Sequence, residues 1–198
     1  MSQIEEIFSH QVGLEKQKKQ LLRSLRAEEF CRSNKIQRET QTMCLAGPPG
    51  TGKTTFAQTI ACLLNKKMIT VPLGELTDAS VLLGTSENSS GSEIGQLTKS
   101  LIESGAPNPL ILLKEIDKVS SSRSSIYSCL ATILDPIQNH KILDHYLDVE
   151  LDFSQATFVI TANDLKKIPE YLLSQMMVID FPGYSIEQKE EIANRFTK

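Results

Sequence analysis

A nine-residue stretch, GPPGTGKTT at positions 47–55, limits the possible folds of this chain more strongly than any other part of its sequence. It lies between an apolar run at residues 43–46 and a helix-forming run at residues 56–64. The pattern GxxxxGK[ST] in this context is typical of a phosphate-binding loop, whose backbone N–H groups surround phosphate oxygens at the positive end of a helix dipole. A plain Gly/Pro turn after a strand is the alternative, but such a turn does not require the complete motif.

The residues of this loop are expected to have different roles in phosphate binding. Gly47, Gly50 and Gly52 allow the backbone to curl so that successive N–H groups point inward. Lys53 is expected to reach the β- and γ-phosphates, and the Thr54 hydroxyl to ligate Mg²⁺. The motif therefore predicts ATP or ADP as the ligand and Mg²⁺ as the cofactor. The full set of predicted contact residues in the loop is Gly47, Pro48, Pro49, Gly50, Thr51, Gly52, Lys53, Thr54 and Thr55.

Length, charge and cysteine content together predict a cytoplasmic protein of one domain. The 198 residues suit a single domain, and a net charge of −3 with a pI near 5.7 does not indicate a general binder of nucleic acids or membranes. Four widely spaced cysteines, three of them in apolar runs, are expected to be buried thiols rather than disulfides or metal ligands. Neither a signal peptide nor an apolar run of about 18 residues is present, so we predict a reducing, cytoplasmic location without a membrane span.

The segment before the loop is basic. Leucines at positions 14, 21, 22 and 25 recur at helical spacing and predict an amphipathic helix from Glu15 to about Arg32. Residues 15–38 hold eight Lys or Arg against three Glu. A solvated helix face explains this excess. An electrostatic patch for nucleic acid or an acidic partner is the alternative, but no pattern of interleaved aromatic residues supports it, so we do not expect nucleic acid as a partner.

Apolar runs alternate with helical patterns along the rest of the chain. Strands are predicted at residues 43–46, 68–73, 110–113, 157–161 and 178–181, and helices at residues 56–64, 78–83, 96–104 and 124–137. Residues 84–95 read as a polar loop rich in Gly and Ser, and two prolines within residues 105–109 end the helix before them. The alternation predicts an α/β fold, a three-layer α/β/α P-loop NTPase sandwich around a central parallel sheet.

Three later stretches are much more specific than a phosphate loop. They are LLKEIDKV at residues 112–119, ILDPIQNHKILDHYLDVELDFSQATFVITAN at residues 133–163, and IPEYLLSQMMVIDFPGYSIEQKEEIA at residues 168–193. Together with GLEKQKKQLL at residues 13–22, they make the chain resemble the ATPase domain of the Lon protease family, within the AAA+ proteins, over nearly its whole length. The resemblance implies the large α/β subdomain of an AAA+ ATPase that assembles into homo- or hetero-oligomeric rings.

The resemblance also implies a domain organisation. Residues 1–40 would be a leader and first helix, residues 41–183 the P-loop core, and residues 184–198 the start of a small helical subdomain. In the family a Ser/Lys peptidase domain follows that subdomain, and this sequence stops before it. We therefore expect no peptidase chemistry in the chain.

Four residues outside the loop receive roles from the resemblance. Glu115 corresponds to the carboxylate that polarises the attacking water, and Asn163 to the sensor that contacts this water or the γ-phosphate. Val12 and Gly13 belong to the segment that covers adenine, although the family usually has an aromatic residue where this chain has Val12. A surface acid after a strand and a strand-end turn are the plain alternatives for Glu115 and Asn163.

Three positions depart from the family pattern. Lys114 replaces the Asp that closes the Walker B strand and holds Mg²⁺ through its water shell, and a cation there repels the metal. Ser174 and Gln175 stand where an Asp-Arg pair should supply the arginine that completes a neighbouring subunit's site. Ser89 and Ser90 stand where an aromatic and an aliphatic residue should grip a translocating polypeptide.

These departures favour one of three functional interpretations. We predict an ATP-binding AAA+ module that hydrolyses ATP weakly, because groups that serve the metal, the ring and the substrate are all altered. A fully active protein-remodelling ATPase is the alternative if Glu115 or Asp117 serves the metal and Arg123 acts on the neighbouring subunit. A non-catalytic, nucleotide-regulated interaction module is the second alternative.

Overall fold

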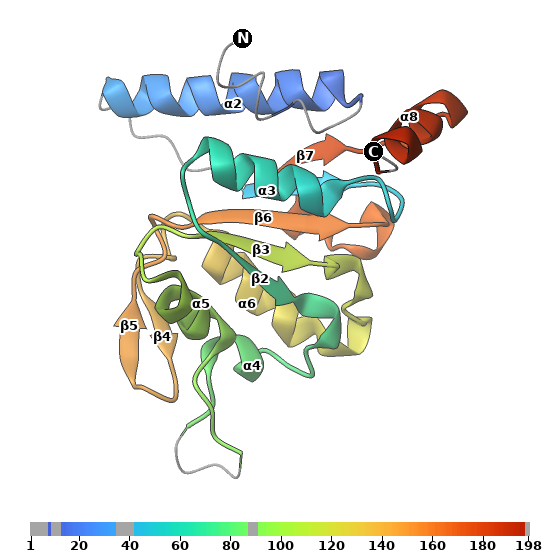
Figure 1. Ribbon diagram of the computed structural model, residues 1–198. Helices are drawn as coiled ribbons and strands as arrows, with labels where there is room; N and C mark the ends of the chain where they lie inside the picture. Colours follow the sequence, from blue (N-terminus) through green and yellow to red (C-terminus); the bar gives the residue numbers. More distant parts are fainter. Residues whose placement is uncertain (1–7, 9–12, 35–41, 87–90, 197–198) are drawn as a thin grey trace.

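The computed structural model describes residue 8 and residues 13–34, 42–86 and 91–196, which form a sheet of five strands between helices (Figure 1). The strands are β1 (Thr42–Ala46), β2 (Met68–Pro72), β3 (Leu110–Lys114), β6 (Thr157–Ala162) and β7 (Met176–Asp180). They lie in the order β2-β3-β6-β1-β7, and every neighbouring pair is parallel. The predicted central parallel sheet is confirmed, and each predicted strand overlaps one of these five.

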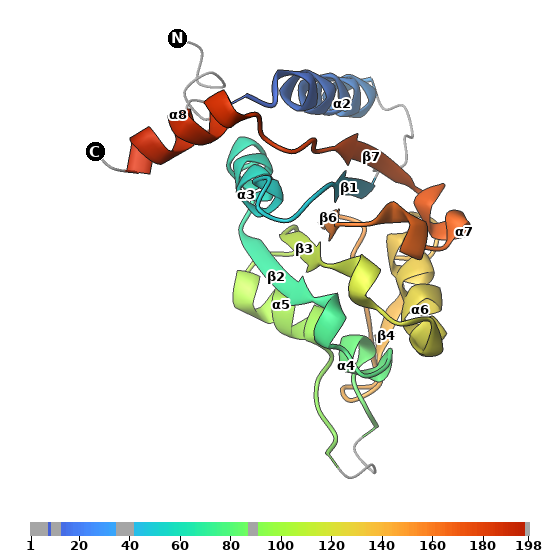
Figure 2. The same cartoon turned by 90° about the vertical axis from the view of Figure 1, so that its right-hand side faces the viewer.

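Helices cover both faces of this sheet (Figures 1 and 2). On one face lie α2 (Glu15–Ser33) and α3 (Lys53–Leu63), and on the other α4 (Ser80–Leu83), α5 (Gln96–Ser104) and α6 (Ser124–Leu134). The short α7 (Glu170–Leu173) precedes β7, and α8 (Ile186–Phe196) follows it. The predicted three-layer α/β/α sandwich is therefore confirmed. None of the described helices has the length and apolarity that a membrane span needs.

The sheet is buried on both sides because successive residues of each strand face opposite helix layers. In β3, Leu110 and Leu112 pack in the core under α2 and α3, whereas Ile111 and Leu113 pack in the core under α4, α5 and α6. All four side chains are fully buried. This two-sided burial explains why the strands read in the sequence as continuous apolar runs rather than as alternating patterns.

Helix α2 covers the edge of the sheet at β7. Two of its glutamines donate hydrogen bonds to outward carbonyls of this strand, from Gln17 Nε2 to Asp180 O and from Gln20 Nε2 to Val178 O. The edge of an open sheet leaves such carbonyls without a strand partner. The predicted helix from Glu15 therefore has a structural role, because its side chains satisfy the edge strand.

Two differences from the sequence prediction concern α6 and the segment that follows it. The helix predicted to run to residue 137 ends at Leu134, because Asp135 takes the extended conformation that a residue before proline prefers, and Pro136 follows it. Residues 142–151, for which the sequence predicts no strand, form an antiparallel hairpin of β4 (Ile142–Asp144) and β5 (Val149–Leu151).

A buried carboxylate ties this hairpin to the start of α5. Asp144 is 2% exposed; its Oδ1 accepts from the N–H groups of Tyr146 and Leu147, and its Oδ2 accepts from the Gly95 N–H and the Thr98 hydroxyl. Burial acts to raise the pKa of Asp144, but these four hydrogen bonds outweigh it and hold the pKa below its ordinary value. The hairpin is thus fixed by contacts with residues up to 49 positions away.

The cysteine prediction is only partly right. Cys44 is buried in β1 and Cys129 is half-buried in α6, and burial raises the thiol pKa of each to about 12. Cys62 is exposed on α3, against the prediction of a buried thiol, because it lies on the helix face that turns away from the sheet. All three are free thiols, and the side chain of Cys31 lies outside the described part of the chain.

Candidate functional site

Residues 47–52 of the motif form the loop between β1 and α3 (Figure 2), and close contacts require glycine at two of its positions. A methyl group at Gly47 would lie 2.0 Å from the carbonyl oxygen of Phe181, and one at Gly52 would lie 2.9 Å from the Tyr184 hydroxyl oxygen. Gly52 also has φ +83°, a conformation that glycine adopts without steric cost. The loop therefore passes so close to the segment after β7 that a side chain does not fit between them.

Hydrogen bonds hold the loop in this shape. The buried Thr51 hydroxyl donates to the Pro48 carbonyl across the loop at 2.9 Å. The Tyr184 hydroxyl donates to the Thr51 carbonyl at 3.0 Å, and the Gly47 N–H donates to the Ala162 carbonyl of β6 at 3.1 Å. The curled backbone is thus supported by contacts with two other parts of the chain.

Helix α3 presents its positive end to this loop. Gly52 is the N-cap and carries no side chain that could accept from the N–H groups of the first helical turn. These N–H groups and the helix dipole favour an anion at this place. The order of strand, loop and helix is the arrangement that the GxxxxGK[ST] motif requires.

Lys53 is held beneath the loop by three acceptors. The residue is 8% exposed, and its ammonium donates to Gly47 O at 2.5 Å, Pro48 O at 2.8 Å and Asn163 Oδ1 at 3.0 Å. An ammonium has three N–H donors, so a phosphate oxygen that binds Lys53 shares or exchanges one of these acceptors. The structure thereby brings together two predicted site residues that are 110 positions apart in the sequence.

A buried aspartate organises this pair. Burial lowers the pKa of Lys53, while the charges of Asp117 and Glu115 act to raise it. Asp117 lies in a 3₁₀ turn, Ile116–Lys118, and its Oδ1 accepts from the Asn163 N–H at 2.9 Å. Asp117 therefore positions the residue that accepts from Lys53. No local pattern predicts this role, because 46 positions separate Asp117 from Asn163.

Glu115, the predicted water-polarising carboxylate, lies in an ion pair. Its carboxylate is 2.8 Å from the Lys118 ammonium, and 41% of the Glu115 side chain is exposed. Its backbone takes φ +61° after the end of β3, and its N–H donates to the Thr161 hydroxyl of β6 at 3.1 Å. Exposed ion pairs are weak, so Lys118 does not hold this carboxylate firmly, and the predicted role of Glu115 toward a water molecule stays a prediction.

The residues near the loop do not fit the usual Mg²⁺ site of a P-loop ATPase. Such a site combines a loop Ser or Thr, here Thr54, with an Asp at the end of the Walker B strand, but Lys114 ends β3. Asp117 is already bonded to the Asn163 N–H. Within the described ranges, no three His, Cys, Asp or Glu side chains gather as metal ligands. Of the expected pair, only Thr54 is present.

Gly13 lies against α8. It has φ +67°, and a methyl group there would approach the Gln188 side chain of that helix to 2.6 Å. Val12 lies outside the described residues. The contact of Val12 and Gly13 with adenine therefore stays a prediction, with Gly13 at the junction of α2 and α8.

The residues considered for action in a neighbouring subunit make ordinary contacts. The Arg123 guanidinium donates to a backbone carbonyl of its own chain at 2.7 Å. Ser174 and Gln175 follow α7, and both are exposed. Arg123 is thus engaged within the chain, and Gln175 offers a neutral amide where the resemblance implies an arginine. Ser89 and Ser90 lie outside the described residues.

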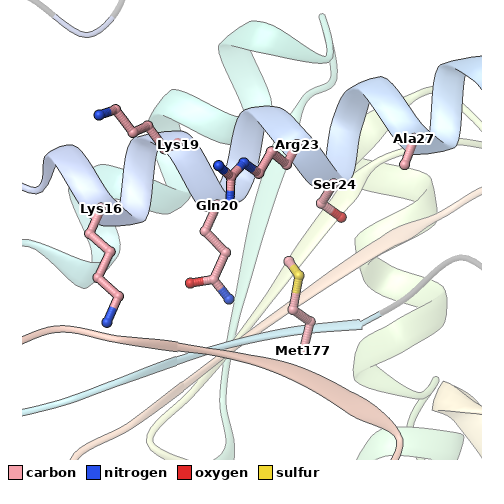
Figure 3. A pocket seen from close by; sticks show the side chains of 7 residues that line it. All are labelled: Lys16, Lys19, Gln20, Arg23, Ser24, Ala27 and Met177. Carbon is pink, nitrogen blue, oxygen red and sulfur yellow. The ribbon is translucent and has the colours of Figure 1, made fainter.

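A second polar surface lies between α2 and β7 (Figure 3). It is a groove of about 630 Å³ whose three basic side chains, Lys16, Lys19 and Arg23, come from α2. Its other lining residues are Gln20, Ser24, Ala27 and Met177. The groove shares no lining residue with the loop at residues 47–55, and none of its lining residues is aromatic. This is the charge pattern of the solvated helix face that the sequence favours.

Comparison with known proteins identifies relatives that match most of the chain. The model of the ATPase family associated with various cellular activities (AAA) matches residues 43–182. Lon protease 1 of Thermus thermophilus is 37% identical over 185 residues, which are 93% of this chain and 23% of that protein. Lon protease of Xanthomonas oryzae is 42% identical over 185 residues, 93% of this chain and 21% of that protein. The chain thus spans about a fifth of the length of these curated relatives.

Proposed function

The chain belongs to the AAA family of ATPases and is similar to Lon proteases, and we propose that it binds ATP. We also propose that it hydrolyses ATP weakly. One observation carries the proposal. Lys53 and Asn163 meet beneath a curled loop whose shape is supported by the chain's own hydrogen bonds. A phosphate entering the loop finds a cation, helix N–H groups and a neutral sensor amide already assembled.

Electrostatics supports the binding of a phosphate at this loop. The positive end of α3 and the Lys53 ammonium both favour anionic oxygens. Burial lowers the pKa of Lys53, and the negative charge of an incoming phosphate would act with those of Asp117 and Glu115 to stabilise its ammonium form. We propose that ATP and ADP bind with their phosphates at residues 47–55 and with adenine near Val12 and Gly13.

Two replaced groups support weak hydrolysis. An arginine supplied by a neighbouring subunit contributes about 10³ to 10⁵ in rate, or about 4–7 kcal/mol, and Gln175 stands in its place. Lys114 stands where an acid would organise Mg²⁺. Glu115 and Asn163 are present at the ends of β3 and β6, where they could orient a water molecule. We therefore expect slow turnover rather than none.

We also propose that the chain enters an AAA ring, with copies of itself or with an active relative, in the cytoplasm. The likeness to ring-forming ATPases supports the assembly. We propose a leader and first helix at residues 1–40, a P-loop core at residues 41–183 and the start of a small helical subdomain at residues 184–198. Helix α8, which begins at Ile186, supports this last boundary. The fully active remodelling ATPase has less support, because Arg123 is engaged within its own chain.

Calorimetric titration with ATP and ADP, run beside a phosphate-release assay, tests the proposal. We expect binding by the wild-type chain, an affinity lower by about tenfold or more in Lys53→Ala, and no change in Lys141→Ala, which alters an exposed lysine. Phosphate release should be slow at every protein concentration and should rise in the double variant Lys114→Asp, Gln175→Arg. Wild-type turnover near the median enzyme rate of about 10 s⁻¹ would contradict weak hydrolysis. No detectable ATP binding would contradict the whole proposal, and binding without any turnover would favour the nucleotide-regulated interaction module.

A further inference from the structure

The strand register fixes which way Lys114 faces. Side chains of a strand alternate between the two faces of its sheet, and Leu110 and Leu112 pack in the core under α3. Lys114 continues this series, whereas Ile111 and Leu113 belong to the opposite core. The side chain of Lys114 therefore projects on the α3 side of the sheet, the side on which the phosphate loop turns into its helix.

Lys114 also lies near the loop along the sheet. Leu113 of β3 pairs with Ile160 of β6, which in turn pairs with Cys44 of β1. One residue further on, Lys114 is level with Leu45, just before the end of β1 where the loop starts. Two strand spacings, about 10 Å, separate the two backbones, and the flexible four-carbon stem of the lysine covers part of that distance.

The carboxylates that follow Lys114 in the sequence have partners other than Lys114. Glu115 lies 2.8 Å from the Lys118 ammonium. Asp117 Oδ1 accepts from the Asn163 N–H at 2.9 Å. Among the described residues, no ion pair involves Lys114. Its positive charge is therefore available to a ligand.

We propose that Lys114 supplies the positive charge that a divalent metal supplies in other P-loop ATPases, so that the chain binds metal-free ATP at least as tightly as its Mg²⁺ complex. The inference rests on the proposed function, because it requires ATP in the loop. A lysine ammonium donates hydrogen bonds and accepts none, so it can neither ligate Mg²⁺ nor hold its water shell. It repels a divalent cation and attracts phosphate oxygens. The ligand class is therefore a nucleoside di- or triphosphate without a bound metal.

Titration of the chain with ATP in EDTA and in excess Mg²⁺ tests the inference. For the wild-type chain we expect dissociation constants that agree within about threefold, or a tighter one in EDTA. Lys114→Asp should bind ATP about tenfold more weakly in EDTA, a change of about 1.4 kcal/mol, and Mg²⁺ should restore the loss. Lys141→Asp makes the same charge change at an exposed position of the chain and should leave both constants within about twofold.

A second variant and a folding check distinguish the loss of the Lys114 charge from misfolding of the chain. Lys114→Met keeps an unbranched stem but removes the charge, so it should lose affinity in EDTA without gaining a response to Mg²⁺, and thermal melting checks that each variant is folded. Wild-type binding that requires Mg²⁺ would overturn the inference and leave the proposed function standing. Equal affinities of the wild-type chain and both Lys114 variants in EDTA would also overturn it. Failure of the wild-type chain to bind ATP in either condition would instead overturn the proposed function.

Discussion

Replacing Asp144 by asparagine should destabilise the fold, although it exchanges only one carboxylate oxygen for an NH₂ group. The carboxylate is an acceptor only, and each of its oxygens accepts from two donors. In Asp144→Asn the amide oxygen can still accept from the N–H groups of the turn, Tyr146 and Leu147. The new NH₂ group then faces the Gly95 N–H and the Thr98 hydroxyl. The hydroxyl can rotate and accept, but the Gly95 N–H loses its acceptor.

The magnitude follows from these contacts. A buried donor left without an acceptor costs about 1–3 kcal/mol, and hydrogen bonds to a charged group are stronger than neutral ones by about 1 kcal/mol. We therefore expect Asp144→Asn to lower the free energy of unfolding by about 2–4 kcal/mol. For a chain of this length, that is a fall in Tm of about 5–15 °C. Urea denaturation at pH 7, followed by circular dichroism, measures the change directly.

The pH dependence of the unfolding free energy shows how much of the stability from Asp144 depends on its negative charge. The hydrogen bonds lower its pKa in the folded chain below the unfolded value of about 3.9, so the stability that it contributes is present above that value. This contribution is lost as the pH falls through the folded-state pKa. The difference in unfolding free energy between the wild-type chain and Asp144→Asn should therefore be complete at pH 7 and should shrink progressively below about pH 4.

Asp148→Asn is the matched control for this experiment. Asp148 lies in the same hairpin but is exposed and has φ +52°, a conformation that asparagine tolerates. Its replacement should change stability by no more than about 0.5 kcal/mol. The reasoning would be refuted if Asp144→Asn changed stability as little as this control does. It would also be refuted if the difference from the wild-type chain were as large at pH 3 as at pH 7.

Three further predictions concern the loop and the thiols. Gly47→Ala places a methyl group 2.0 Å from a carbonyl oxygen, so calorimetry should show ATP affinity lower by about tenfold or more; unchanged affinity would contradict the close approach of the two backbones. Tyr184→Phe removes the hydrogen bond to the Thr51 carbonyl and should lower the free energy of unfolding by about 1 kcal/mol in urea denaturation, with no effect if the hydroxyl is solvated instead. Burial raises the pKa of Cys44 to about 12, so at pH 8 a thiol reagent should label the exposed Cys62 quickly and Cys44 only after unfolding; equal labelling rates would contradict the burial of β1.

Much of the fold could be predicted because the relevant signals are local. The helix predicted at residues 96–104 has the same bounds as α5, since Gly105 and the prolines after it end the pattern sharply. The strands could be found because burial on both faces makes each of them a continuous apolar run. The hairpin could not, because its strands have three residues each and its anchor, Asp144, accepts from groups that precede it by more than 45 positions.

The candidate site divides in the same way. The position of the loop could be found from the sequence, because its glycines, lysine and threonine follow each other within nine positions, whereas its contacts with phosphate stay a prediction. The role of Asp117 could not, since it acts through the backbone of Asn163, which follows a different strand. The pairing of Glu115 with Lys118 is a local contact, but it depends on the φ of +61° that turns Glu115 out of the strand pattern.

Residue types at short, set spacings were enough to predict a phosphate-binding loop, and to establish the family and the alternation of strands and helices. The folded arrangement was needed to establish that Lys53, Asn163 and Asp117 form one hydrogen-bonded chain, and that Lys114 projects on the α3 side of the sheet. The reason is the order of the strands. The carboxyl ends of parallel strands lie at one edge of the sheet. Which residues meet at that edge depends on the order of the strands in the sheet, and this order is set by the folded structure.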